Sequence, residues 1–489
     1  MSGTIRQKNP AYVSHSKMAR MNIEWKGTAA PAGFKAEWWT PRLTGPLLAA
    51  TVVRVALLAA ALARTGVSAL VQPDTSSYLI PGRNLLLHGR FFADGVPDLL
   101  RTPGYPLLLA ITSLAGPLAG AVANVLLSVF SVILVWRLGR AAFVDDRIAI
   151  GAAWIFAFEP LSVANSVVLL SETLFLALFL LSLERLAAFL RGHSLRALAA
   201  SGMWLAAATL VRPVTYYLPV ALAMGLFMVL AREPGLRWKA PAVLLISVLP
   251  WLAAWQARNK LETGYSGLTS VSDLNLYFFV AADVTARVEH RRVKDVLDEL
   301  GYRGCPDCSE QVYLYPAYFA RHPEQTGWTQ AQQLTFMHSE AVGVIRTHFG
   351  VYLRTWTPHL FEAVFDPGAG PFNSLLNFGS SMTVNHLILY ADPVRGALAL
   401  VRAYPWIAAE KAAFLVVLLG LYLLAARGAL RGGMPGACLW LLLGTSLYFF
   451  VISAAAGGAG VTARYRLPVM PIVCVLAAAG VLRSRNVEQ

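Results

Sequence analysis

The charged residues of most interest in this 489-residue sequence lie within or beside long apolar segments, where an ionised side chain is costly unless it has a partner. Inside these segments or at their tight turns are Arg54, Glu159, Glu172 and Arg212, and beside them are Asp74, Arg101, Arg464 and Arg466. Carboxylates in such places can accept protons, and guanidiniums can bind anions. Most of the group falls at one depth, the outer boundary of the apolar segments, and is therefore a candidate functional site.

Two of these arginines have a structural explanation that competes with a functional one. Arg54 and one of Arg464 and Arg466 could extend their long side chains to the membrane surface, with the charge in water and the stem in lipid. Glu172 fits this explanation poorly, because the short stem of a carboxylate side chain cannot reach far. Glu172 therefore stays among the functional candidates.

Asp74 and Arg101 also have structural alternatives. The sequence Pro73-Asp74-Thr75-Ser76 precedes an apolar-periodic run, so Asp74 could be the N-cap of a helix. Capping and catalysis can coexist at one residue. Arg101 could anchor a lipid headgroup. At this point, both residues have a structural and a functional interpretation.

Composition identifies the elements that must position these residues as membrane-spanning helices. The chain is 56% hydrophobic and 14% charged, with a mean hydropathy of +0.54, whereas a soluble domain carries about 25% charged residues. The apolar blocks have roughly the length of about 20 residues that a helix needs to cross the hydrocarbon core. A soluble protein is thereby excluded, and we expect an all-α integral membrane protein.

About ten transmembrane helices are predicted. The candidate spans are residues 44–66, 118–138, 147–168, 170–190, 196–211, 213–231, 240–257, 408–427, 435–455 and 466–482. Every second loop is basic: the cytoplasmic segments with their adjoining helix ends hold 20 basic and 7 acidic residues, and the rest of the chain holds 21 and 20. The positive-inside rule then places both termini in the cytoplasm and explains the net charge of +14 without nucleic acid.

The spans divide the chain into four parts. These are a basic cytoplasmic tail (1–43), a transmembrane module (44–257) with its first outer loop (68–117), an outer segment (258–405), and the C-terminal helices with a short cytoplasmic tail (406–489). The apolar stretches 105–116 and 341–365, the second interrupted at Pro358, are expected to lie in the membrane interface. Further membrane-embedded helices within 341–402 remain open.

Several short motifs resemble those of one enzyme superfamily. In the first outer loop they are Asp74 with Tyr78, Gly89-Arg90-Phe91, and Arg101-Thr102-Pro103-Gly104-Tyr105-Pro106; later come Ser171-Glu172, Arg212-Pro213, Arg258-Asn259 and Arg464-Tyr465-Arg466-Leu467-Pro468. In their order and membrane depth they resemble the GT-C glycosyltransferases. The nearest group is the bacterial relatives of protein O-mannosyltransferases and of the aminoarabinose transferase that acts on lipid A.

The resemblance implies a GT-C fold and transfer of a sugar, with inversion, from a polyprenyl-phosphate carrier at the outer face. It assigns the base to Asp74 and the phosphate contact to Arg101, with Glu172 as a second catalytic candidate. Further substrate-binding candidates are Tyr78, Tyr105, Arg212, Arg258, Arg464 and Arg466. Relatives often carry a second acid directly after the aspartate, and Thr75 stands there instead, so metal assistance through paired acids is not favoured.

Cysteine and histidine add less. Cys305 and Cys308 form a CxxC in the outer segment, and we expect a local disulfide there, without a part in the chemistry. Cys438 and Cys474 lie in predicted spans and are expected to be packing residues. The histidines of the outer segment lack the spacing of a metal motif, and no cofactor is expected.

The sequence thus predicts a glycosyltransferase of the bacterial inner membrane, with its site facing the periplasm. Its partners would be a polyprenyl-phosphate sugar, membrane lipids, and a lipid, polysaccharide or protein acceptor. The alternative is a polytopic transporter or lipid flippase that uses the same charges for transit. The concentration of charges at one depth and the lack of a visible internal repeat weigh against this alternative. A non-catalytic membrane subunit is the third class considered.

Overall fold

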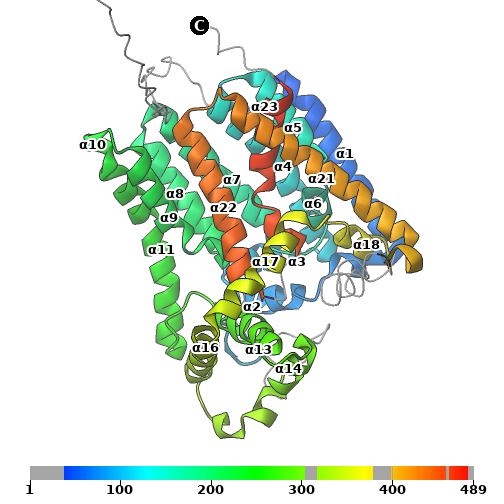
Figure 1. Ribbon diagram of the computed structural model, residues 1–489, viewed down its shortest axis with the longest axis vertical. Helices are drawn as coiled ribbons and strands as arrows, with labels where there is room; N and C mark the ends of the chain where they lie inside the picture. The colour runs from blue at the N-terminus through cyan, green and yellow to red at the C-terminus, as the bar shows by residue number, and fades with distance from the viewer. Residues whose placement is uncertain (1–37, 303–316, 378–397, 399, 459–461, 483–489) are drawn as a thin grey trace, which may run out of the picture. The chain divides into compact units, whose positions relative to one another are not determined.

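The computed structural model describes residues 38–302, 317–377, 398, 400–458 and 462–482, and it is almost entirely helical (Figure 1). Six helices in the described ranges are long and apolar enough to cross a membrane. They are α1 (Thr44–Thr65), α4 (Pro117–Phe143), α7 (Glu172–Gly192), α11 (Lys239–Thr263), α21 (Pro405–Arg431) and α22 (Gly436–Ala456). The prediction of an all-α membrane protein is confirmed.

The other four predicted spans fall on shorter helices. These helices are α5 (Asp146–Ala157) with α6 (Pro160–Asn165), α8 (Leu195–Thr209), α9 (Leu218–Val229) after η3 (Pro213–Thr215), and α23 (Met470–Val481) after η7 (Ala463–Arg466). Helix α5 packs against α4 and α23, α8 against α7 and α11, and α9 against α11 and α22. Since a full span takes about 20 residues, the total of ten stays a prediction.

The predicted span 147–168 is broken, and the break explains two of the candidate charges. Helix α5 ends at Ala157, and Pro160 begins α6 after Glu159, whose carboxylate accepts the N–H groups of Leu161 (3.1 Å) and Ser162 (2.6 Å). Arg54 of α1 is fully buried and donates to the carbonyl of Ala157 at 2.9 Å. The idea that Arg54 reaches the membrane surface is therefore wrong, because its charge is held among internal polar partners.

A close approach of two helices fixes the last helix. Helix α23 packs against α21, and a Cβ added at Gly428 or Gly480 would clash with the backbone carbonyl of the facing helix. Small residues allow such contact between helices in a membrane. The contact also sets the position of η7, which directly precedes α23 and carries Arg464.

The first outer loop folds into short elements. They are η2 (Gly66–Leu70), α2 (Thr75–His88), the two-residue antiparallel strands β1 (Phe92–Ala93) and β2 (Val96–Pro97), and α3 (Gly104–Ser113). Outside this loop, two further short helices, η1 (Pro41–Leu43) and α10 (Pro234–Arg237), precede α1 and α11. The predicted helix in 105–116 is thus present as α3, which packs against α2 and α4.

The outer segment builds a second hydrophobic core, which one residue of the first outer loop joins. Its elements are α12 (Val271–Leu274), the π-helix η4 (Asn275–Ala281), α13 (Ala282–Val288), α14 (Val293–Glu299), η5 (Pro323–Gln325), α16 (Gln330–Thr347), α17 (Phe349–Phe365) and α18 (Gly370–Leu376). In Figure 1, α13, α14 and α16 gather at the end of the bundle where α2 and α17 also lie. The buried side chains include Tyr277, Phe278, Tyr318 and, from the first outer loop, Leu99.

Two expectations about this segment and its boundary need correction, and a third stays a prediction. The helical stretch 341–365 divides at His348, where the backbone leaves the helical region, and Pro358 lies inside α17 without ending it. Helix α11 also runs past the expected boundary at 257 to Thr263. Cys305 and Cys308 lie outside the described residues, so their disulfide stays a prediction.

The orientation can be tested by labelling. In a Cys305→Ser, Cys308→Ser background, cysteines replacing the exposed Glu289 and Glu324 should react with an impermeant maleimide on intact cells. A cysteine replacing the exposed Arg232, before α10, should react only after permeabilisation. The reverse pattern would place the outer segment in the cytoplasm.

Candidate active site

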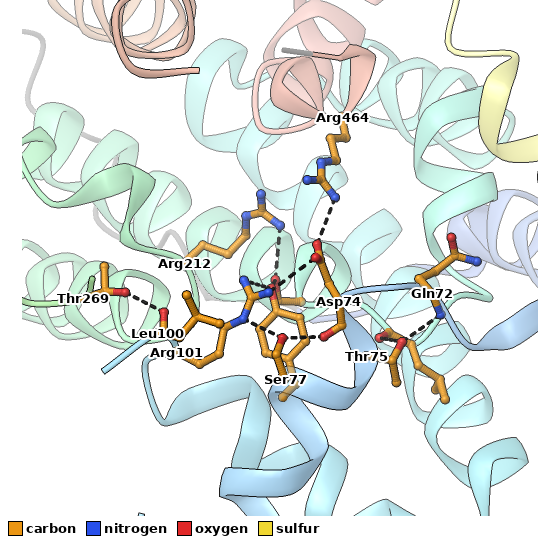
Figure 2. A network of polar contacts seen from close by, with 12 residues as sticks. Gln72, Asp74, Thr75, Ser77, Leu100, Arg101, Arg212, Thr269 and Arg464 are labelled. Carbon is orange, nitrogen blue, oxygen red and sulfur yellow. Dashed lines mark hydrogen bonds and ion pairs between the residues drawn. The ribbon is translucent and has the colours of Figure 1, made fainter. Parts of the chain in front are cut away.

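Asp74 immediately precedes α2, but its side chain does not cap the helix. Asp74 has a helical backbone conformation, and its side chain makes no capping hydrogen bond. Thr75 supports the turn instead: its hydroxyl accepts the N–H of Gln72 at 2.8 Å and donates to the carbonyl of Leu169 at 3.0 Å. The carboxylate of Asp74 points into a polar cluster, which Figure 2 shows. The capping explanation of Asp74 is therefore wrong.

Arg101 is held from several sides. Its Nη2 lies 3.4 Å from Asp74 Oδ1, its Nε donates to Ser77 Oγ at 2.9 Å, and its Nη1 donates to the Tyr78 hydroxyl at 3.3 Å. The guanidinium carbon also lies 4.3 Å from the centre of the Tyr78 ring. Ser77 and Tyr78 stand one turn beyond Asp74 on α2, so one helix end supplies the carboxylate and most of the arginine's other contacts. The side chain of Arg101 is only 12% exposed.

A second acid and two further arginines complete the cluster. Glu172, at the first turn of α7, is buried, and its Oε1 lies 2.5 Å from Arg212 Nη1 and 3.8 Å from Arg464 Nη1. The same nitrogen of Arg464 lies 3.4 Å from Asp74 Oδ2. Arg464 therefore bridges the two carboxylates. The Ser171 hydroxyl links the halves, since it lies 3.1 Å from both Arg212 Nη1 and the Tyr78 hydroxyl.

The cluster carries a surplus of positive charge. In the described part of the chain it comprises three guanidiniums and two carboxylates, which leaves one net positive charge. A pocket borders it, lined by Glu172, Phe175, Arg212, Val214, Phe449, Arg464, Tyr465, Leu467 and Pro468. Charged side chains thus meet apolar ones at its wall. Such a place suits an anion attached to an apolar group, since a guanidinium binds an anion more strongly where water is sparse.

Three of the predicted substrate-binding residues contact the chain around the cluster. Arg466 is buried and donates to the carbonyls of Ala363, Val364 and Asp366, so it joins η7 to the end of α17. Arg258 donates to the carbonyls of Phe91 and Asp98 and pairs with Glu262 at 2.8 Å. Tyr105 is buried edge-to-face on Tyr78, and its hydroxyl accepts from Asn124 at 3.3 Å. These residues frame the cluster and do not line its pocket.

Asp98 is a buried residue of this region that sequence reasoning missed. Its Oδ1 accepts the N–H groups of Leu100 (2.7 Å) and Arg101 (3.0 Å), which turns the chain toward the cluster. Burial raises the pKa of Asp98 to about 6, although the N–H groups and the charges of Arg101 and Arg258 lower it. An aspartate two or three residues before a polar turn was the available signal, since its side chain often accepts these N–H groups.

Comparison with known proteins places the chain beside one group of enzymes. Residues 102–255 match the family described as dolichyl-phosphate-mannose-protein mannosyltransferase, which confirms the resemblance predicted from the motifs. The matched range contains Glu172 and Arg212 but begins just after Arg101 and contains neither Asp74 nor Arg464. No curated protein sequence matches the chain.

Several solved structures are similar at low identity. The oligosaccharyltransferase AglB from Archaeoglobus fulgidus, with an inhibitory peptide and a dolichol-phosphate, is 14% identical over 90% of this chain and 50% of its own, with a TM-score of 0.46. For its apo form the TM-score is 0.48, with the same identity and coverage. ArnT from Cupriavidus metallidurans bound to undecaprenyl phosphate is 14% identical over 89% and 77%, with 0.37. The chain thus spans about half the length of the archaeal enzyme.

Asp98 gives a pH-dependent prediction. Its folded-state pKa of about 6 exceeds the usual value of about 3.9, so its contribution to stability is greatest at low pH and is lost as pH rises through that interval. Asp98→Asn keeps an oxygen for the two N–H groups and carries no charge. In detergent, the melting temperature of the variant should lie a few degrees above that of the wild type at about pH 7.5. At about pH 4.5 the two melting temperatures should be the same. An equal shift at both pH values would contradict this.

Proposed function

We propose that the protein is a membrane glycosyltransferase that moves a sugar from a polyprenyl-phosphate donor to an acceptor at the outer face of the bacterial inner membrane. The observation that carries the proposal is the position of Asp74, whose carboxylate lies between Arg101 and Arg464 instead of capping α2. The matched family supports the reaction class, since its description names a lipid-phosphate sugar and transfer of mannose.

The arrangement suits an inverting displacement. The acceptor oxygen attacks the anomeric carbon, the bond from that carbon to the phosphate oxygen breaks, and the phosphate leaves with the electron pair. The acceptor's proton passes to Asp74, and the products are a glycoside and a polyprenyl phosphate. Negative charge grows on the phosphate during this step, and the net positive cluster offers Arg101, Arg464 and Arg212 to stabilise it.

Glu172 has a supporting role in this proposal. Its carboxylate is buried beneath Arg212 and Arg464, so it neutralises part of their charge and fixes where their guanidiniums point. Asp74 is more accessible, with 21% of its side chain exposed against 3% for Glu172. A substrate hydroxyl can therefore approach Asp74 more readily, and Asp74 is the base we propose.

We further propose that transfer needs no nucleotide and no metal ion. Thr75, where relatives carry a second acid, holds the turn before α2 through its contacts with Gln72 and Leu169. The two carboxylates of the cluster are joined by the guanidinium of Arg464. A fixed guanidinium can bind the donor phosphate with two hydrogen bonds and needs no proton transfer of its own.

Arg101→Lys tests the phosphate contact. A lysine keeps the charge but cannot contact Ser77, Tyr78 and a phosphate at once, because it lacks the planar fork of donors. Affinity for undecaprenyl phosphate in lipid nanodiscs should fall about tenfold, while Arg83→Lys, on the same outer loop, leaves it unchanged. Equal affinity of Arg101→Lys and wild type would remove Arg101 from the donor site.

Asp74→Asn tests the base. Asparagine matches the size of aspartate but lacks the basic oxygen, so the variant should fold and transfer sugar at least about a hundredfold more slowly. Turnover would be followed with radiolabelled polyprenyl-phosphate sugars and host membranes. The matched control is Asp94→Asn, at an exposed position of the same loop whose φ of 53° asparagine tolerates. Turnover of Asp74→Asn close to that of Asp94→Asn would mean that another group takes the proton.

A further inference from the structure

The outer segment shares its hydrophobic core with the loop that carries Arg101. Leu99, two residues before Arg101, is 2% exposed and belongs to the cluster formed by Tyr277, Phe278 and Tyr318 with α16. Burying a leucine side chain stabilises such a contact. The first outer loop is therefore attached to the outer segment at a point directly beside the candidate active site.

Hydrogen bonds reinforce this attachment at Leu99 itself and at Leu100. The N–H of Ser270 donates to the carbonyl of Leu99 at 2.8 Å, and the hydroxyl of Thr269 donates to the carbonyl of Leu100 at 2.6 Å. Figure 2 shows the contact between Thr269 and Leu100 beside Arg101. Thr269 and Leu100 are both 2% exposed, so water cannot readily replace the hydroxyl.

Thr269 is itself held in place by its neighbours. Its hydroxyl oxygen accepts the N–H of Val271 at 3.3 Å, and its carbonyl oxygen lies 2.9 Å from the hydroxyl of Tyr265. That hydroxyl also lies 2.6 Å from Asp273, which in turn lies 2.8 Å from Nδ1 of His338 on α16. The hydroxyl of Thr269 thus uses both its donor and its acceptor capacity.

A second set of contacts also fixes the backbone around Arg101. Asp98 accepts the N–H groups of Leu100 and Arg101, and Arg258 donates to the carbonyl of Asp98 at 2.8 Å. Between this support and Thr269, the peptide units before Arg101 have little freedom. The Arg101 side chain then continues to Asp74, Ser77 and Tyr78.

We infer that Thr269 is a positioning residue for Arg101: the outer segment sets the donor-binding guanidinium through the hydroxyl of Thr269 and the carbonyl of Leu100. That Arg101 binds the donor rests on the proposed function, whereas the contact between Thr269 and Leu100 does not depend on it. An outer segment joined in this way acts on donor binding, in addition to any contact it makes with the acceptor.

The test compares Thr269→Val, which keeps the shape and removes the hydroxyl, with Thr269→Ser, which keeps the hydroxyl. Hydrogen–deuterium exchange of a peptide covering 98–103 reports the backbone, and undecaprenyl phosphate binding in nanodiscs reports the guanidinium. Thr269→Val should speed exchange in that peptide and weaken binding about tenfold, and Thr269→Ser should do neither. Thr335→Val, an exposed position on α16 whose hydroxyl bonds only within its helix, is the control.

Each result decides the inference. Unchanged exchange in Thr269→Val, or a serine variant as impaired as the valine variant, overturns it. Thr269→Val is also made in an Arg101→Ala background. If it weakens binding there by the same factor as in the wild type, the inference is overturned, because the effect would not pass through Arg101. If the wild type binds no undecaprenyl phosphate, the proposed function fails, and the exchange measurement alone decides whether Thr269 holds this loop.

Discussion

The structure depends on one constraint: a charge near the hydrocarbon core must be paired inside the protein. Arg464 meets it by lying between Asp74 and Glu172, and Arg212 by pairing with Glu172. Asp74 and Arg212 directly precede α2 and η3, and Glu172 and Arg464 lie in α7 and η7, so their pairing ties together segments far apart in the sequence. The same contacts that make burial of the charges tolerable also assemble the candidate active site.

The fold class and the composition of the cluster could be predicted from the sequence. Long apolar blocks indicate spanning helices directly, and α1 begins and ends within about one residue of its predicted bounds. Asp74, Arg101, Glu172, Arg212 and Arg464 were singled out because ionised residues at such depth are rare, and the structure brings them together. Their positions at the ends of the apolar segments were informative even without knowledge of their neighbours in space.

What the sequence could not supply was the partner of each charge. Arg466 stands two residues from Arg464 in one motif, yet the tight η7 turn directs it to the carbonyls at the end of α17. Glu159 has the burial of a functional acid but caps α6. Helix breaks were similarly hidden, because an apolar stretch has the same composition whether or not Pro160 starts a new helix within it. Such distinctions depend on tertiary contacts.

The broken helix has a consequence for how the protein is made. Arg54 leaves the ribosome in α1 well before Ser128, Ala157 and Ser162, the residues that later accept its hydrogen bonds. Until α4, α5 and α6 are in place, the charge of Arg54 in α1 lacks the partners that make its burial tolerable. The hydrogen bonds of Arg54 thus make the stability of α1 in the membrane depend on helices that follow it in the chain.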